Sequence, residues 1–347
     1  MSLLNRKKVV ATWAPLINFL GLPKWFGKKH AGIGTILMFH RVLPNSTGPR
    51  VHNHESLEVD PGRLEKTIDF FSARNYDFIS ISQVPEYLQL GRNKFVAFTF
   101  DDGYADNLEN AYPIFKKHNI PFTIYVTTNF INRTAVVWWY LLEEILLKNQ
   151  QLSIGWKGEM LHYTCKNIRQ KEATFVQIRN LVMHGLDPEN HLRDLQELFA
   201  GHIDDLFAFT DKHMASWAQL TAAASDPLIT LAAHTANHLP LKLLSPDGLY
   251  KEIIEASAEL AGQTQTKIEH FAYPYGKMAE AGEREYGFVH SHGFTTAVTT
   301  NIGNVKSEHL QSLCSLPRVN VNAFTTPAVL ELHISGFIST VKSRLKI

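Results

Sequence analysis

The feature that most constrains this fold is an apolar run that ends abruptly in two carboxylates and a glycine. The run Phe95–Phe98 is followed by Thr99-Phe100-Asp101-Asp102-Gly103-Tyr104. Aromatic and β-branched residues that dominate a short stretch predict a buried strand, here with charge at its C-terminal end. In α/β folds, catalytic groups gather at the carboxyl ends of parallel strands. Because adjacent side chains of an extended backbone point to opposite sides, Asp101 and Asp102 need not share one role.

Further apolar runs alternate with helical patterns along the chain. We expect strands at 36–40, 78–82, 95–100, 121–128, 228–234, 270–274, 295–300 and 316–321, and helices that begin at Pro61, Leu108 and Pro246. This alternation predicts a parallel sheet, closed or open. The pattern changes between about 130 and 215, which we interpret as a mostly helical insertion between two core strands. A final amphipathic helix contains Val329 and Val341.

Length and composition exclude several classes of protein. A chain of 347 residues can form one large α/β domain with insertions, or two domains. With 34 basic and 33 acidic residues the net charge is +1, which predicts no nucleic-acid partner. Cys165 and Cys314 lie far apart without CxxC spacing, so neither a disulfide framework nor a thiolate zinc site is indicated. We expect two buried thiols.

The N-terminal segment 1–30 is basic and mildly apolar. Arg6, Lys7 and Lys8 precede an apolar stretch that Pro15 and Asn18 interrupt. The stretch is shorter than the about 20 apolar residues that a membrane span needs, and no small-residue cleavage site follows it. Two interpretations remain: a segment that lies on a membrane surface, or a helix packed on the domain. We expect a cytoplasmic protein, with membrane association through this segment as an option.

A pair of histidines follows the expected strand at 228–234. His234-Thr235-Ala236-Asn237-His238 is a His-x-x-x-His stretch, and residues four apart on a helix or tight turn can chelate one divalent ion. With 17 histidines in the chain, chance spacing is the alternative. The position at a strand end, like that of Asp102, favours a metal. Two imidazoles and one carboxylate leave coordination positions open, as in catalytic zinc sites.

Three of these stretches together resemble a known family. TFDDGY, HTANH and FAYPYG, starting at Thr99, His234 and Phe271, look like the first three motifs of the polysaccharide deacetylases, the NodB-homology group or carbohydrate esterase family four. The similarity covers about 33–321 apart from the insertion. It implies an α/β fold, a distorted (β/α) barrel with a helical insertion, and a catalytic domain at 31–347.

The resemblance also implies roles for individual residues. Asp101 would be the catalytic base, and Asp102, His234 and His238 would hold a divalent metal ion, for which zinc is the expected identity. The backbone amide of Tyr275 would help to stabilise the tetrahedral oxyanion.

The stretch LMFHRV at Leu37–Val42 adds a narrower similarity. It is similar to the first strand of deacetylases of poly-N-acetylglucosamine, in which the late Leu-x-His motif of the family has moved to the front. His40 would then be the general acid, with a hydrogen-bonded strand-end histidine as the alternative. No Leu-x-His occurs in the C-terminal part, and His333 is interpreted as a surface residue.

The third motif departs from the family pattern. Ala272 and Tyr273 occupy the positions where an arginine commonly orients the base, and the motif-four Asp and Trp pattern is not recognisable. Arg318 is the candidate to pair with Asp101 instead.

Four other residues have a structural interpretation. We interpret Asp106 as a helix-start acid and Tyr104 as a packing aromatic. For Trp138-Trp139, core packing is favoured over a sugar-stacking platform.

The expected function is removal of N-acetyl groups from amino sugars in a glycan, glycoconjugate or lipid-linked saccharide, in the assembly of a surface polysaccharide. An O-acetyl esterase or an N-deformylase would use the same ligands. A non-catalytic glycan-binding protein on the same fold is the alternative from another class.

Overall fold

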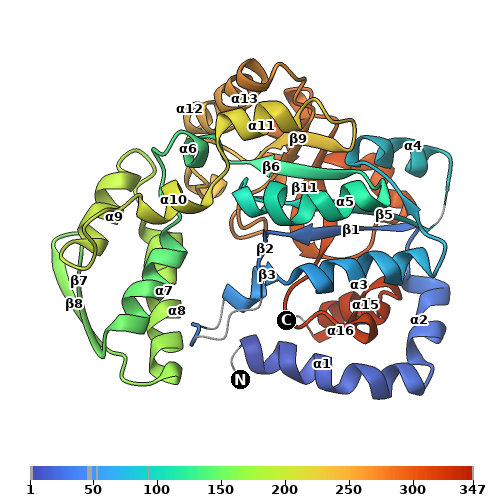
Figure 1. Cartoon of the computed structure of the whole chain (residues 1–347), viewed down its shortest axis with the longest axis horizontal. Helices are drawn as coiled ribbons and strands as arrows, with labels where there is room; N and C mark the ends of the chain where they lie inside the picture. Colours follow the sequence, from blue (N-terminus) through green and yellow to red (C-terminus); the bar gives the residue numbers. More distant parts are fainter. Residues whose placement is uncertain (1–2, 45–48, 52–53, 93, 346–347) are drawn as a thin grey trace.

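Seven parallel strands close into a distorted barrel (Figure 1). The computed structural model describes residues 3–44, 49–51, 54–92 and 94–345. The ring runs β1-β12-β11-β10-β9-β6-β5 and closes because β1 pairs with both β12 and β5. Its strands are β1 (Gly34–Phe39), β5 (Phe95–Phe100), β6 (Phe122–Val126), β9 (Ile229–Ala233), β10 (His270–Ala272), β11 (Thr296–Ile302) and β12 (Leu316–Asn320). The predicted barrel is confirmed.

One predicted strand is much shorter than expected. At 78–82 only β4 (Asp77–Phe78) is extended, and it pairs with the start of β5. The chain then turns into a 3₁₀ segment at Ile81–Gln83, because the side chain of Gln83 accepts hydrogen bonds from the backbone and hydroxyl of Ser80. Two residues of parallel pairing, β2 (Arg41–Val42) with β3 (Glu58–Val59), lie beside the barrel.

Helices cover the outside of the barrel. They are α3 (Pro61–Ser72), α4 (Val84–Gln89), α5 (Tyr112–His118), α11 (Trp217–Ala223), α12 (Pro246–Leu249), α13 (Ala256–Thr264) and α14 (Glu283–Ser291). The helices predicted from Leu108 and Pro246 each contain a π-helical segment, at Asn107–Ala111 and Tyr250–Glu255. Such wider turns are common at functional sites.

One side chain from each strand of the ring forms a buried layer inside the barrel. This cluster is separate from the larger one beneath the outer helices; the residues of the layer are Ile36, Ala97, Tyr125, Ala232, Ala272, Val298 and Leu316, and Phe95 at the start of β5 belongs to the same cluster. Side chains alternate along a strand, so the residues two and four positions after a layer residue also point into the barrel. These residues lie nearer the C-terminal mouth of the barrel. The alternation therefore selects which side chains can reach the mouth.

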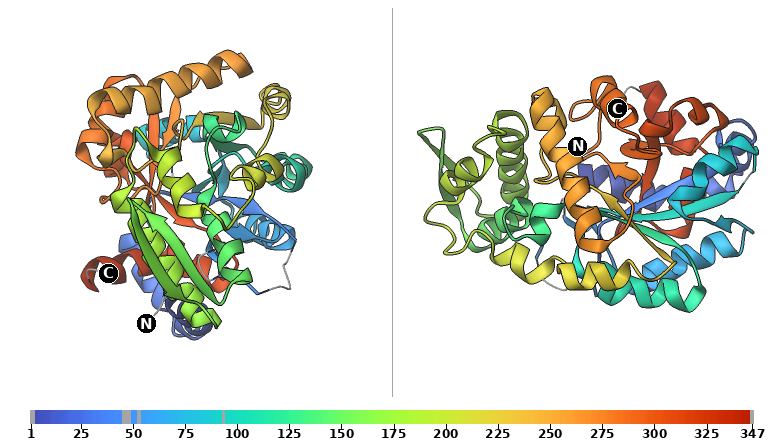
Figure 2. Two further views of the ribbon diagram at one scale, coloured as in Figure 1. Left: turned by 90° about the vertical axis from the view of Figure 1, so that its left-hand side faces the viewer. Right: turned by 90° about the horizontal axis from the view of Figure 1, so that it is seen from above.

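The residues between β6 and β9 form an insertion that stands beside the barrel mouth (Figure 2). It contains α6 (Thr128–Ile131), α7 (Trp138–Lys148), β7 (Gln151–Trp156), β8 (Glu159–Thr164), α8 (Ile168–Gly185), α9 (His191–Phe199) and α10 (Ala208–His213). A mostly helical interpretation leaves out the antiparallel hairpin β7–β8. Its signal was present: apolar and polar residues alternate along β7, and Lys157-Gly158 forms a left-handed two-residue turn.

Helices from both ends of the chain pack together against one flank of the barrel. They are α1 (Leu3–Phe19), α2 (Leu22–His30), α15 (Pro327–Ile334) and α16 (Phe337–Leu345). The single C-terminal helix that was predicted is wrong: Gly336 has a φ of 72° and separates two helices. A Cβ at Gly336 would collide with the carbonyl oxygen of His30. No helix among the described residues is long and apolar enough to cross a membrane.

Two further predictions about single side chains have different outcomes. Cys165 and Cys314 are buried free thiols, as expected. His333 is half-buried on α15 rather than on the surface, and burial lowers its pKa to about 4. In the predicted segment 1–30, residues 1–2 lie outside the described residues, as do the side chains of Arg6 and Lys7. The division into segments 1–30 and 31–347 stays a prediction.

Candidate active site

The barrel mouth carries four polar side chains that the alternation along the strands points inward. His40 lies four residues beyond the layer residue of β1, and Asp101 lies four beyond that of β5. His234 and Arg318 lie two residues beyond the layer residues of β9 and β12. Four segments far apart in the sequence therefore meet in one place, which the parallel ring makes possible.

Asp102, His234 and His238 form the cluster that could hold a metal ion. Their ligand atoms all lie within 4.8 Å of one another, and all three side chains are buried. Asp102 Oδ1 lies 3.4 Å from His234 Nε2 and 3.3 Å from His238 Nε2. His234 Nδ1 lies 2.7 Å from the carbonyl oxygen of Ala272, and a proton on Nδ1 leaves Nε2 as the ligand atom.

The donor set fits a divalent ion. Asp102 Oδ1 is buried and has no hydrogen-bond partner among the described residues. An unpaired buried carboxylate oxygen is costly unless a cation satisfies it. Burial alone would raise the pKa of Asp102, but the charge of His238 and the closeness of His234 hold this pKa well below its ordinary value. The ligand is therefore in its anionic form, as metal binding requires.

Left-handed backbone turns aim the cluster. Asp102 has a φ of 77°, Thr235 of 68°, His238 of 57° and Tyr275 of 59°. Non-glycine residues are uncommon in this region, and a β-branched one such as Thr235 is an outlier. Its hydroxyl accepts a hydrogen bond from the backbone N–H of His238 at 2.9 Å. Strain of this kind persists where surrounding structure enforces it, and it gathers at functional sites.

Arg318 fixes the side chain of Asp101. Arg318 Nη1 and Nη2 donate to the two carboxylate oxygens at 2.7 Å each, and Nε donates to the carbonyl oxygen of Thr299 at 2.9 Å. Both partners of this bidentate pair are buried. Burial alone would raise the pKa of Asp101, but the charges of Arg318 and His234 outweigh it and lower the pKa. The structure thus makes the Arg318–Asp101 contact for which the sequence named Arg318 as the candidate.

His40 is half-buried at the mouth, and its Nδ1 has no hydrogen-bond partner among the described side chains. Its backbone carbonyl accepts a hydrogen bond from Asn107 at 2.7 Å, so the main chain is held while the ring faces the cleft. Burial lowers the pKa of His40, against the raising effect of Asp102 and Asp101. The general-acid role of His40 and the alternative of a hydrogen-bonded strand-end histidine both stay predictions.

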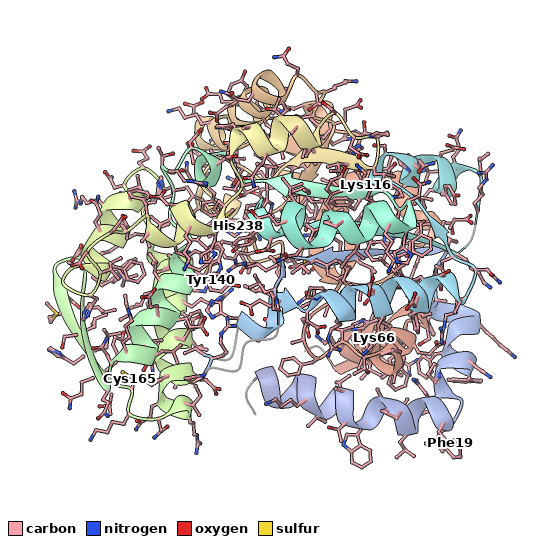
Figure 3. All side chains as sticks on the ribbon, viewed as in Figure 1. Phe19, Lys66, Lys116, Tyr140, Cys165 and His238 are labelled. Atoms are coloured by element: carbon pink, nitrogen blue, oxygen red, sulfur yellow. The ribbon has the colours of Figure 1, made fainter. Side chains whose placement is uncertain are left out.

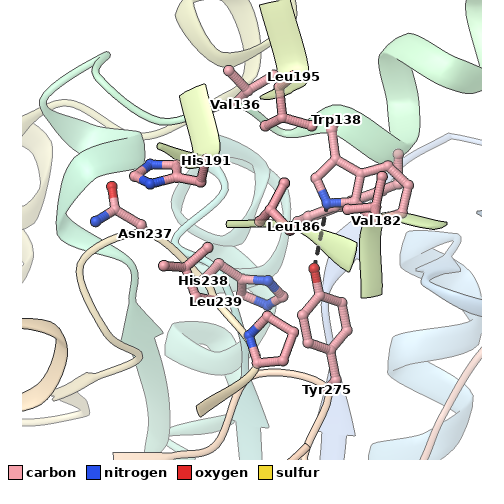
Figure 4. Close-up of a pocket in the computed structure, with 12 residues that line it drawn as sticks. Val136, Trp138, Val182, Leu186, His191, Leu195, Asn237, His238, Leu239 and Tyr275 are labelled. Carbon is pink, nitrogen blue, oxygen red and sulfur yellow. Dashed lines mark hydrogen bonds between the residues drawn. The ribbon is translucent and has the colours of Figure 1, made fainter. Parts of the chain in front are cut away.

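Tyr275 joins the metal cluster to the insertion (Figure 4). Its ring packs edge-on against His238 at 4.6 Å, and its hydroxyl accepts a hydrogen bond from Trp138 Nε1 at 3.3 Å. Its backbone N–H donates to no acceptor among the described residues. The sequence pointed to the Tyr275 amide; the structure adds a contact made by the side chain.

A cleft of about 960 Å³ lies between the mouth and the insertion. Its floor includes His40, Asp101 and Asp102, and helix α8 forms one wall with Arg169, Arg179 and neighbouring residues. Trp138 and Trp139 are buried, as expected of core residues, yet both also line the cleft. The two interpretations of this pair therefore do not exclude each other.

A charged network ties the segment around residues 50–58 to helix α7. Arg50 makes two hydrogen bonds of 2.7 Å to Glu58 and two of 3.1 Å to Glu143. His54 Nδ1 lies 3.2 Å from Glu143, and the Tyr140 hydroxyl donates to Glu58 at 2.8 Å. Sequence reasoning missed this network, since no motif marks it.

Tyr104, the last residue of the first motif, and Asp106, two residues beyond it, are structural. Tyr104 is buried, as a packing aromatic should be. Asp106 is also buried: it pairs with Arg41 at 2.8 Å and accepts the Val42 N–H at 2.7 Å. Neither lines the cleft. They hold the loop after β1 against the chain that follows β5.

Comparison with known proteins agrees with this geometry. Residues 90–289 match the polysaccharide deacetylase family, and the chain belongs to that family, whose members are carbon–nitrogen hydrolases. His40 and Arg318 lie outside the matched residues. A putative polysaccharide deacetylase, YxkH of Bacillus subtilis (strain 168), is 31% identical over 94 residues, which cover 26% of this chain and 30% of that protein.

Two solved structures share the fold. The Streptococcus pyogenes deacetylase PplD, in complex with acetate, has a TM-score of 0.55 at 18% identity, over 86% of this chain and 97% of that one. IcaB from Ammonifex degensii has a TM-score of 0.53 at 17% identity, over 88% and 98% of the two chains. At these identities the likeness concerns the distorted barrel alone.

Proposed function

We propose that this protein is a zinc-dependent deacetylase that hydrolyses the N-acetyl groups of amino sugars in a glycan or glycoconjugate. The observation that carries the proposal is the union of two sets of side chains at one cleft. The buried ligand set Asp102, His234 and His238 adjoins Asp101, whose carboxylate Arg318 holds in place. An ion held by that set would supply Lewis-acid polarisation of the amide carbonyl.

The remaining groups divide the proton transfers. Asp101, ionised because Arg318 lowers its pKa, accepts a proton from the attacking water as the new C–O bond forms. His40 donates a proton to the amide nitrogen as the C–N bond breaks, and the products are acetate and a free amine. The Tyr275 N–H, which has no acceptor among the described residues, is a donor for the oxyanion. These roles rest on position and on the motifs.

The substrate proposal rests on the cleft. A volume of about 960 Å³ exceeds what a single acetyl group requires, so the cleft has room for sugar units on either side of the reacting amide. Trp138 and Trp139 offer aromatic surface at one wall. A glycan or lipid-linked saccharide fits these features, while the compartment in which the protein acts stays a prediction from the sequence.

A test is acetate release from acetylated oligosaccharides of defined length, with and without added zinc. We expect activity that a chelator abolishes and zinc restores, and a loss of roughly 10²- to 10⁴-fold in Asp101→Asn, which keeps the shape of the side chain but cannot act as base. Release from O-acetylated or N-formylated sugars alone would favour the esterase or deformylase instead. Equal rates for the native protein and Asp101→Asn on every substrate would overturn the proposal.

A further inference from the structure

The outer face of α1 carries a row of large apolar side chains. Trp13 and Leu16 lie three residues apart on α1 and are 54% and 46% exposed. Phe19, the last residue of α1, is 87% exposed, and Leu20 directly after it is 62% exposed. Figure 3 shows Phe19 at the outer edge of the helix, away from the barrel. The opposite face of α1 packs through Ala14 on residues of α15 and α16. Over residues 9–17 every side chain of α1 except Thr12 is apolar. A helical stretch that is apolar on all faces is normally covered on all sides, whereas this one is covered on one.

Helix α2 continues this apolar surface. Leu22 is 36% exposed and Trp25 is 70% exposed, while the neighbouring Phe26 packs inward on Phe337 at 5.0 Å. We name Val9, Trp13, Leu16, Phe19, Leu20, Leu22 and Trp25 the N-terminal patch. These seven are nearly half of the fifteen exposed large apolar side chains among the described residues. Scattered single residues need no explanation, but the concentration of these seven within residues 9–25 indicates an interaction surface.

The charged side chains of the segment that carries the patch are all basic. The first 54 residues contain no aspartate or glutamate, in a chain whose net charge is only +1. Lys24, Lys28 and Lys29 are exposed beside Trp25, and none of them pairs with a carboxylate among the described residues. A second copy of the chain seated on this patch would bring lysines against lysines. Tryptophan with lysine on one surface suits the headgroup region of a bilayer with anionic lipid.

We propose that the N-terminal patch docks the protein onto the surface of a membrane that contains anionic lipid. The aromatic and leucine side chains enter the interface, and the lysines lie among the lipid headgroups. Helix α2 ends close to where β1 begins, at the end of the barrel opposite the mouth. Docking therefore leaves the cleft open, so membrane binding and hydrolysis can be measured independently.

The test is co-sedimentation of the full chain with vesicles of phosphatidylcholine alone or mixed with phosphatidylglycerol. We expect binding to the mixed vesicles that weakens as salt rises. A variant with Trp13→Ser, Phe19→Ser, Leu20→Ser and Trp25→Ser should bind the mixed vesicles at least roughly tenfold more weakly than the native chain. The matched control, Leu90→Ser, Met160→Ser and Leu310→Ser, removes exposed apolar side chains elsewhere and should bind as the native chain does.

A second pair of variants tests the charges. The triple variant Lys24→Gln, Lys28→Gln and Lys29→Gln should lower the ratio of affinity for mixed vesicles to affinity for phosphatidylcholine vesicles by roughly tenfold or more. The control variant Lys148→Gln with Lys267→Gln should leave this ratio unchanged. Circular dichroism and acetate release from a soluble oligosaccharide should be equal for all these chains.

Three results would overturn the proposal. They are native protein that fails to bind the mixed vesicles, a control set as damaging as the patch set, and light scattering that shows a dimer which the patch variant dissociates without any vesicle binding. If acetate release fails while vesicle binding persists, the proposed activity is wrong and the docking surface stands.

Discussion

The barrel mouth and the insertion share one cleft but fix their side chains in different ways. At the mouth, Asp101 and Arg318 extend from barrel strands and form a buried bidentate pair. The insertion meets the barrel side through side-chain contacts, such as Trp138 with Tyr275 and Glu143 with Arg50. Continuous strand pairing holds the first region, whereas isolated backbone hydrogen bonds, such as Ala215 N–H to Gly103, apolar packing and side-chain contacts hold the second.

The difference indicates which property each region controls. Groups on the strands of a closed ring cannot move unless the ring opens. This rigidity suits bond cleavage, which requires the reacting groups to keep fixed positions. A substitution at one side-chain contact of the junction can shift this wall locally and leave the mouth intact. We therefore expect changes at the mouth to remove activity or stability, and changes at the junction to alter substrate affinity.

The largest effect should come from Asp102→Ala, which removes the carboxylate shared by His234 and His238. Loss of the ion removes its stabilisation of the transition state, so kcat/KM should fall roughly 10³-fold or more. Elemental analysis should show the metal content fall in step. Asp247→Asn, on the exposed surface of α12, is the control and should keep the native kcat/KM and the native metal content. Retained metal with lost activity would assign Asp102 a role other than ligand.

Next in size is Arg318→Met, which leaves Asp101 buried and unpaired. Breaking a buried ion pair by removing one partner costs about 3–5 kcal/mol. Urea unfolding should show a loss of that size. The double variant Arg318→Met with Asp101→Asn should recover most of it, because no uncompensated charge remains. A double variant no more stable than the single one would show that Arg318 acts through packing alone.

Sequence reasoning reached much of the mouth and little of the junction. Asp101, Asp102, His234 and His238 lie in two short motifs, each directly after a strand, so the strand pattern and the family resemblance were enough to name them. Asp101 and Arg318 lie 217 residues apart, and their pairing depends on how the strand ring closes. Arg318 could therefore be named as a candidate but not positioned. Glu143 and Arg50 meet only because α7 docks on the barrel side, which no residue spacing encodes.

The junction should be sensitive to acid through Glu143. Burial would raise the pKa of this carboxyl, but hydrogen bonds and charge from His54 and Arg50 outweigh it and lower the pKa from 4.5 to about 2. A lowered folded-state pKa gives stability that is present above pH 4.5 and is lost as pH falls toward 2.

The contribution of Glu143 should be up to about 3 kcal/mol. Urea unfolding of the native chain and of Glu143→Gln across this pH range should show it. The difference in free energy of unfolding between the native chain and Glu143→Gln should narrow as the pH falls. A difference that stays constant would contradict the lowered pKa of Glu143.

The smallest effect should come from Trp138→Phe, which removes the donor to the Tyr275 hydroxyl. A lost hydrogen bond of this kind costs about 1 kcal/mol, and the change should raise KM several-fold more than it lowers kcat. Trp139→Phe is the matched control, because Trp139 Nε1 is buried without a partner among the described residues. If both variants behave alike, the Trp138 contact does not position Tyr275.

The left-handed turns at Asp102, Thr235, His238 and Tyr275 have a consequence for protein engineering. Glycine adopts this conformation without a Cβ penalty, so relaxing such positions tends to stabilise a fold. Directed evolution that rewards heat resistance alone would thus gain from replacing two of the three metal ligands. A library built on this scaffold should keep these codons constant, or thermostability will be acquired at the cost of the site.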